Sequence, residues 1–233
     1  MTILGAVPSA VDEPSCYSLA RNDWFCPAYL ADRRSELLDA TVQHLGITVA
    51  AVLVGLLIAV PLALLARRLP RLEAGVLAVS TGIYTVPSLA LFSLLLPFTG
   101  LSAATVVIGL ALYALTILVR ALLDGLRAVP EAVRESATGL GYSRSRRLLR
   151  VELPLALPVV MAGLRVATVS TVALTTVGAL VSYGGLGNLL VTGVAQSFRA
   201  QILTAAVLCV VLAVLLDALL VLAQRALTPW TRA

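Results

Sequence analysis

Charged residues are rare in this chain, and many of them lie in one stretch near its middle. Residues 133–158, with the sequence VRESATGLGYSRSRRLLRVELPLALP, hold five arginines and two glutamates between long apolar segments. Charges of both signs on a surface suit complementary contacts with another macromolecule, because they steer and orient a partner. We interpret this stretch as a docking surface and not as a catalytic site.

Two absences argue against enzyme chemistry. The sequence has no lysine, whereas a Walker-type phosphate loop needs a lysine that reaches the terminal phosphates. Any ATP, with its magnesium, must then bind another chain. His44 is the only histidine, which excludes a histidine-based metal cluster, and we expect it to be a polar residue at the membrane interface. We expect no catalytic residue, metal or cofactor on this chain.

The composition is that of an integral membrane protein. Hydrophobic residues make up 60% of the 233 residues and charged residues 12%, against roughly 45–50% and about 25% in soluble domains. Apolar runs such as VAAVLVGLLIAV do not alternate with polar residues, which favours helices over barrel strands. Runs of about 20 residues or more, enough to cross a bilayer, cover residues 44–66, 74–96, 103–123, 157–181 and 201–223. The predicted fold class is an all-α integral membrane protein with five transmembrane helices.

Arginines indicate the orientation of these spans, because cytoplasmic loops beside span ends are enriched in positive charge. Arginine clusters follow the first, third and last spans, whereas residues 1–40 hold three arginines against six acids. The amino terminus is thus expected outside and the carboxyl terminus in the cytoplasm, and no nucleic-acid partner is needed to explain the basic balance. The expected divisions are an extracytoplasmic segment at 1–40, a membrane domain at 41–225 and a cytoplasmic tail at 226–233.

The outer segment contains two cysteines and a group of aromatic residues. Cys16 and Cys26 can form a disulfide in an oxidising compartment or can be two unpaired small residues, and the sequence leaves both open. Trp24, Phe25 and Tyr29 are typical of an aromatic belt at the outer membrane interface. A cage for a quaternary ammonium ligand is the alternative, although aromatic residues at a membrane boundary are more often anchors.

Polar residues inside the predicted spans are candidates for lining a path across the membrane. They cluster around a proline in the second span and recur along the fourth, and the set comprises Tyr84, Thr85, Pro87, Ser88, Thr171 and Thr175. Hydrogen bonds between helices are the alternative use of these side chains. Arg165 and Asp217 are the ionisable residues nearest membrane depth, and we expect them either to pair or to reach towards an interface. The run GGLG at 184–187 is expected to form a tight turn or a re-entrant bend.

Within the charged stretch, the sequence predicts a short helix over residues 130–141. Pro130 suits its first turn, an acidic residue follows, and Gly141 is typical of a helix end. This helix is too short and too polar to cross the membrane, and it suits insertion into a partner's groove. A solvated connecting helix is the alternative. Its apolar positions are Ala132, Val133, Ala137 and Leu140.

The residue spacing across this stretch resembles the EAA motif of ABC importer permeases. The Glu-Ala-Ala, Gly and Ile-x-Leu-Pro pattern of that family is matched by Glu135, Ser136, Ala137, Gly141, Val151, Leu153 and Pro154, with serine and valine as the two departures. The resemblance implies a cytoplasmic coupling helix between the third and fourth spans, seated in a cleft of an ATPase subunit. Glu135 would anchor that contact and Gly141 would allow the turn. The implied coupling residues are Glu131, Ala132, Glu135, Ser136, Ala137, Gly141, Leu153 and Pro154.

The resemblance also implies a function. The segments YTVPSLALFSLLLPFTG and MAGLRVATVSTVALTTVGALVSYGGLGNLL are similar to permeases for glycine betaine, choline, carnitine and related quaternary amines. The implied protein has the type I ABC importer fold and is a multi-pass permease subunit of a bacterial plasma (inner) membrane importer for a small osmoprotectant. Methionine or another amino acid is the alternative substrate, because methionine importer permeases share the five-span core and a similar GGLG turn.

The partners implied by this family are proteins and lipid. They are a cytoplasmic ATPase dimer that binds ATP and magnesium, a second permease chain, identical or paralogous, and an external substrate-binding protein, all working by alternating access at the lipid bilayer. An ion-coupled secondary transporter would need midmembrane carboxylates or inverted repeats, and the sequence shows neither convincingly. A membrane-anchored assembly protein would explain the spans but not the spacing of the motif.

Overall fold

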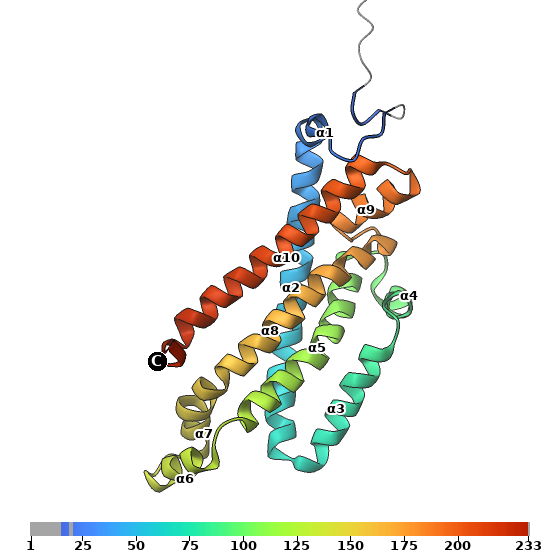
Figure 1. The fold of residues 1–233 in the computed structure, drawn as a ribbon. Coiled ribbons are helices and arrows are strands. Elements are labelled where there is room, and N and C mark those ends of the chain that lie inside the picture. The colour runs from blue at the N-terminus through green and yellow to red at the C-terminus, as the bar shows by residue number, and fades with distance from the viewer. Residues whose placement is uncertain (1–14, 19–20, 233) are drawn as a thin grey trace, which may run out of the picture.

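The computed structural model describes residues 15–18 and 21–232, and the regular structure of that part of the chain is entirely helical (Figure 1). The all-α prediction is therefore confirmed. The α-helices are α1 (Pro27–Asp32), α2 (Arg34–Arg68), α3 (Pro70–Thr85), α4 (Ser88–Thr99), α5 (Ala103–Arg127), α6 (Glu131–Gly139), α7 (Arg144–Arg147), α8 (Leu153–Thr175), α9 (Leu186–Ala195) and α10 (Arg199–Leu227). A π-helical turn, η1 (Leu148–Glu152), joins α7 to α8, and 3₁₀ turns form η2 (Thr176–Val181) and η3 (Pro229–Arg232).

Four helical segments of the described residues are long and apolar enough to cross a membrane. They are α2, α5, the continuous stretch Arg144–Val181, and α10. The second predicted span, residues 74–96, is not one helix: α3 and α4 meet at an angle of 99°. The proline at position 87 explains the break, because it disfavours helical geometry in the residue before it, and Val86 is extended with ψ 128°. Counting the bent pair as one crossing gives five spans.

Helix α5 forms the centre of the bundle, because α2 and α8 both pack along it. Leu118 and Leu122 of α5 meet Ala59 of α2 and Ala167 of α8 in one buried apolar cluster. A helix that is buried on several sides is apolar around most of its circumference. The long apolar sequence of α5 therefore reflects contact with other helices as much as contact with lipid.

Small residues bring the neighbouring helices close to α5. A Cβ added to Gly55 of α2 would lie 3.2 Å from the carbonyl oxygen of Ala111, and a Cβ added to Gly163 of α8 would overlap the Cβ of Ala121. Within a bilayer the lipid tails are as apolar as the side chains, so close van der Waals packing supplies much of the attraction between helices. These two glycines therefore set the distances of α2 and α8 from α5.

Helix α10 packs against α8 and α9. Many of its apolar side chains are exposed. Val210, Val214 and Leu219 are each about 60% exposed. Arg165 of α8 donates two hydrogen bonds to Asp217 of α10, over 2.7 and 2.8 Å. Arg165 and Asp217 were expected either to pair or to reach towards an interface, and the structure shows that they pair. This bidentate ion pair ties α10 to α8.

His44 is fully buried, so the expectation of an interfacial residue is wrong. Its Nε2 atom lies 3.0 Å from the carbonyl oxygen of Val172. Helix α2 begins ten residues earlier, at Arg34, and the GGLG run makes the expected turn and folds back over this part of α2. The backbone N–H of Gly185 in that turn donates to the side-chain oxygen of Gln43 over 3.1 Å. The GGLG turn, which is about 140 residues later in the sequence, therefore covers His44.

Replacement of Gly163 by alanine is expected to destabilise the bundle, because the added methyl group has no room beside Ala121. Overpacking of this kind costs roughly 1–3 kcal/mol. Gly46→Ala is the matched control, since a Cβ at that helical position meets no atom within 4 Å. Thermal unfolding of the two variants in the same detergent tests the expectation. Equal melting temperatures would contradict it.

Candidate functional site

Helix α6 lies at the start of the charged stretch and beyond the ends of the long helices (Figure 1). It spans Glu131–Gly139, against the predicted 130–141. Pro130 precedes it with φ −59° and ψ 141°, so the pyrrolidine ring fixes the entry without removing an intrahelical hydrogen bond. Gly141 follows with φ +77°, a left-handed conformation that glycine adopts without strain. The N–H groups of Gly141 and Tyr142 then cap the carbonyls of Thr138 and Ala137, over 2.9 and 3.1 Å.

One face of α6 turns towards the rest of the chain and the other towards solvent. Ala137 is buried at 5% exposure, and Val133 is half-buried. The predicted coupling residues Glu131, Ala132, Glu135 and Ser136 are exposed, as is Leu140 at 78%. Glu135 makes no ion pair with any residue that the structure describes. Its carboxylate is therefore available to another chain.

Arginine side chains fix α6 to the bundle, a role that the sequence analysis missed. Arg134 donates to the carbonyl oxygens of Leu126 and Val129, over 3.0 and 2.9 Å, and so caps the end of α5. Carbonyls at a helix end have no intrahelical partner and accept such donors readily. Arg147 donates to Thr138 of α6 over 2.8 Å and to Glu152 over 2.8 Å. Contacts from Arg134 to the end of α5 and from Arg147 to Thr138 thus fix the position of α6.

Leu153 and Pro154, predicted as coupling residues, lie at the start of α8 and are half-buried. Leu153 packs against a cluster of buried residues that includes Leu126 and Val129. The structure therefore places these two residues in the joint between α8 and the end of α5. They do not share the exposed face of α6.

The residues predicted to line a path lie in three different settings. Tyr84 is 45% exposed, stacks edge-to-face on Tyr113 with ring centroids 5.7 Å apart, and shares a small depression with Thr171 of α8. Thr85, Pro87 and Ser88 form the break between α3 and α4. Thr175 is fully buried and lies 3.1 Å from the hydroxyl of Thr48, so it links α8 to α2.

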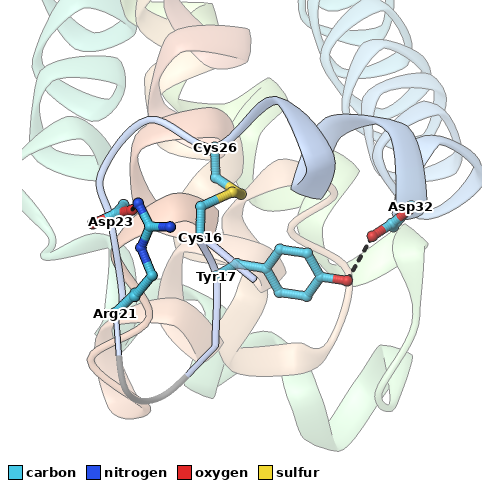
Figure 2. Close-up of a disulfide and its surroundings, with 6 residues drawn as sticks. All are labelled: Cys16, Tyr17, Arg21, Asp23, Cys26 and Asp32. Atoms are coloured by element: carbon cyan, nitrogen blue, oxygen red, sulfur yellow. Dashed lines mark hydrogen bonds and ion pairs between the residues drawn. A yellow bond between two sulfur atoms is a disulfide. The ribbon is translucent and has the colours of Figure 1, made fainter. Parts of the chain in front are cut away.

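At the opposite end of the molecule, the structure joins Cys16 and Cys26 in a disulfide, with Cα atoms 5.6 Å apart (Figure 2). The Tyr17 hydroxyl donates to Asp32 over 2.6 Å, and the pKa of Tyr17 is raised because this hydrogen bond favours the protonated phenol. Asn22 bonds to Ser197 and Arg199 at the turn between α9 and α10. The described part of the outer segment is therefore clamped onto the helical bundle.

Tyr29 corrects the prediction of an aromatic belt. It is only 1% exposed and packs edge-to-face between Tyr17 and Phe198, with centroid distances of 5.9 and 5.3 Å. Trp24 and Phe25 are exposed at 53% and 73% and remain available to an interface. The sequence could not show that Tyr29 is buried while Trp24 and Phe25 are exposed, because the residue that covers Tyr29, Phe198, is distant in the sequence.

Comparisons with known proteins agree with this arrangement. The family described as "Binding-protein-dependent transport system inner membrane component" matches residues 45–233. The choline transport system permease protein OpuBD of Bacillus subtilis (strain 168) is 38% identical over 202 residues, which cover 86% of this chain and 89% of that protein. The osmoprotectant import permease protein OsmW of Salmonella typhimurium is 35% identical over 206 residues, covering 86% and 96%.

The fold is shared with solved transporter structures. An inward-facing structure of the MetNI methionine ABC transporter matches with a TM-score of 0.77 at 22% identity, over 84% of this chain and 98% of that one. A second match, to an amino acid ABC transporter with histidines, has a TM-score of 0.69 at 18% identity, over 85% and 97%. At these identities the likeness shows the fold alone.

The chain belongs to the family of binding-protein-dependent transport system inner membrane components, the permeases of ABC importers. The relatives named above are permeases for choline and osmoprotectants, which confirms the resemblance to that branch. Family membership makes the chain a multi-pass membrane permease subunit of an ABC transporter, a type of subunit that has no ATPase site of its own.

The disulfide predicts a thiol count. After denaturation without reductant, a maleimide reagent is expected to label one of the three cysteines, Cys209, and after reduction to label all three. Mass spectrometry of the intact protein gives the count directly. A Cys209→Ser variant provides the control and should take up no label without reductant. Three labels before reduction would show that Cys16 and Cys26 are unpaired.

Proposed function

We propose that this chain is the transmembrane permease subunit of an ATP-driven importer that moves a small osmoprotectant, such as glycine betaine, choline or carnitine, into a bacterial cell. One observation carries the proposal: α6 is tied to the bundle on one face and presents Glu135 unpaired, among the described residues, on the other. A short exposed helix held in this way suits a groove in a partner protein. The names of the relatives supply the substrate class.

The proposed orientation places α6 in the cytoplasm and the disulfide outside. The ion pair between Arg67 and Glu152 holds the end of α2 beside the turn that follows α7. The arginines at the end of α2 and those of α7 therefore lie at the same end of the bundle. Cytoplasmic ends carry such clusters. Cys26 of the disulfide immediately precedes α1. Helix α1 lies at the opposite end of the bundle from α6 (Figure 1), where an oxidising exterior would preserve the disulfide. Five crossings then leave the amino terminus outside.

The proposed mechanism is alternating access. Two permease chains, identical or paralogous, form the path between them, and each receives one subunit of a cytoplasmic ATPase dimer at α6. ATP and magnesium bind the ATPase, whose closure displaces α6 and switches the path from inward-open to outward-open. An external binding protein delivers the substrate and performs the tight selection. Each ligand shifts the equilibrium only by its difference in affinity for the two states.

A quaternary ammonium substrate would pass aromatic rings on its way. Tyr84 is 45% exposed and packs on the buried Tyr113 beside the small depression between α3, α5 and α8. The face of an aromatic ring attracts a cation, and the attraction grows when water is excluded. We assign these rings a transient contact and not high-affinity binding.

Glu135→Ala is expected to abolish uptake and substrate-stimulated ATP hydrolysis, because it removes the unpaired carboxylate at the proposed ATPase contact. The variant should remain inserted in the membrane, since Glu135 forms none of the ion pairs of the described residues. Co-purification of the ATPase and uptake by whole cells are the measurements. Glu36→Ala removes an exposed acid at the outer end and serves as the control. Normal uptake by the Glu135 variant would overturn the assignment of α6.

The substrate class is tested with the cognate external binding protein. Binding of glycine betaine, choline, carnitine, proline and methionine is measured by calorimetry, followed by competition for uptake. We expect quaternary amines to bind and compete, and methionine to do neither. Selective binding of methionine would place the chain among amino-acid importers while leaving its role as a permease intact.

A further inference from the structure

Glu152 is a buried carboxylate in the charged stretch, and the proposed docking of an ATPase does not use it. Its side chain is 1% exposed, and it is the last residue of the π-helical turn that joins α7 to α8. Single π-helical turns within helices are rare and are frequently found at functional sites. Here the turn directs Glu152 into the protein, against two arginines.

The two arginines come from different parts of the chain. Arg147 of α7 donates from Nε to Oε1 of Glu152 over 2.8 Å. Arg67, in the last turn of α2, forms an ion pair with Oε2. Both arginine side chains are about a quarter exposed, so the carboxylate is covered by the guanidinium groups that neutralise it. Glu152 therefore joins α7 and α8 to a helix that lies some 80 residues earlier in the sequence.

Arg147 extends this network to the proposed coupling helix. Its Nη1 atom donates to the Thr138 hydroxyl of α6 over 2.8 Å. A continuous series of polar contacts thus runs from Thr138 through Arg147 and Glu152 to Arg67. At its far end is α2, which packs along α5 and continues to the outer end of the molecule beside the GGLG turn.

The buried carboxylate makes these contacts act as a unit. Removing either arginine would leave a charge in a site of low dielectric constant without compensation, which is strongly unfavourable. If a displacement of α6 moved Arg147, Glu152 would either lose its partner or move together with Arg147. In the second case Arg67, which is paired with Glu152, would move as well.

We propose that Glu152 is a positioning residue that transmits the displacement of α6 to the cytoplasmic end of α2, an inference that rests on the function proposed above. The alternative is a purely structural ion pair. The chain contains a matched control in Arg165 and Asp217, which form an arginine–carboxylate pair between α8 and α10 and make no contact with α6.

The test uses the complete complex of permease, ATPase and binding protein reconstituted in liposomes. ATP hydrolysis and substrate uptake are measured in the same vesicles for the wild type, Glu152→Gln, Arg67→Gln, Arg67→Lys and Asp217→Asn. For Glu152→Gln we expect the ATPase to remain bound and hydrolysis to continue, while the uptake per ATP hydrolysed falls about tenfold, the size of a typical coupling between sites. Arg67→Gln should behave in the same way, whereas Arg67→Lys, which keeps the charge, should retain most of the coupling.

The outcomes separate the two roles. If Glu152→Gln and Arg67→Gln lower hydrolysis and uptake together, as Asp217→Asn would if it loosens the fold, the pair is structural and the inference is wrong. An unchanged ratio of uptake to hydrolysis also overturns it. If Glu152→Gln does not fold, Arg67→Gln decides. Failure of the wild-type complex to import with ATP would instead overturn the proposed function itself, and the inference with it.

Discussion

The close packing of α5 between α2 and α8 is the constraint on which the rest of the molecule depends. Lipid provides no hydrophobic drive for helices to associate, so attraction must come from surfaces that fit closely. Gly55 and Gly163 supply that fit on the two sides of α5. Because these contacts fix three helices, the ends of α2, α5 and α8 that lie nearest α6 are held close together, and α6 packs against them.

Two arginines make the polar contacts that hold α6 at that end of the bundle. Arg134 caps the carbonyls at the end of α5, and Arg147 bridges α6 to the buried Glu152. Arg134 therefore ties α6 to the end of α5, and Arg147 ties α6 to the turn that precedes α8. As a result α6 is anchored on one side only, and its other face keeps Glu135 and Leu140 exposed. The separation of an anchored face from an exposed face is what makes this short helix suitable as a contact for another protein.

Local signals in the sequence predicted the helical class, the extent of α6 and its glycine turn, because proline, glycine and apolar runs act through nearby backbone geometry. Long-range packing decided what was missed. His44 and Tyr29 were expected at an interface but are buried, since residues more than 100 positions away cover them. The bend at Val86 follows from Pro87, but the apolar sequence continues on both sides of it, so hydropathy predicts a single span. The partners of Glu152 also come from distant segments, so its role had no local signature beyond a charge among apolar residues.

The source of energy for transport tests the central claim most directly, since it separates an ABC importer from an ion-coupled transporter. Vesicles containing the complete complex are given a labelled quaternary amine, with its binding protein on the outer side, under two conditions: internal ATP without an ion gradient, and an imposed ion gradient without ATP. Our account predicts uptake in the first condition and none in the second. Uptake driven by the gradient alone would contradict it.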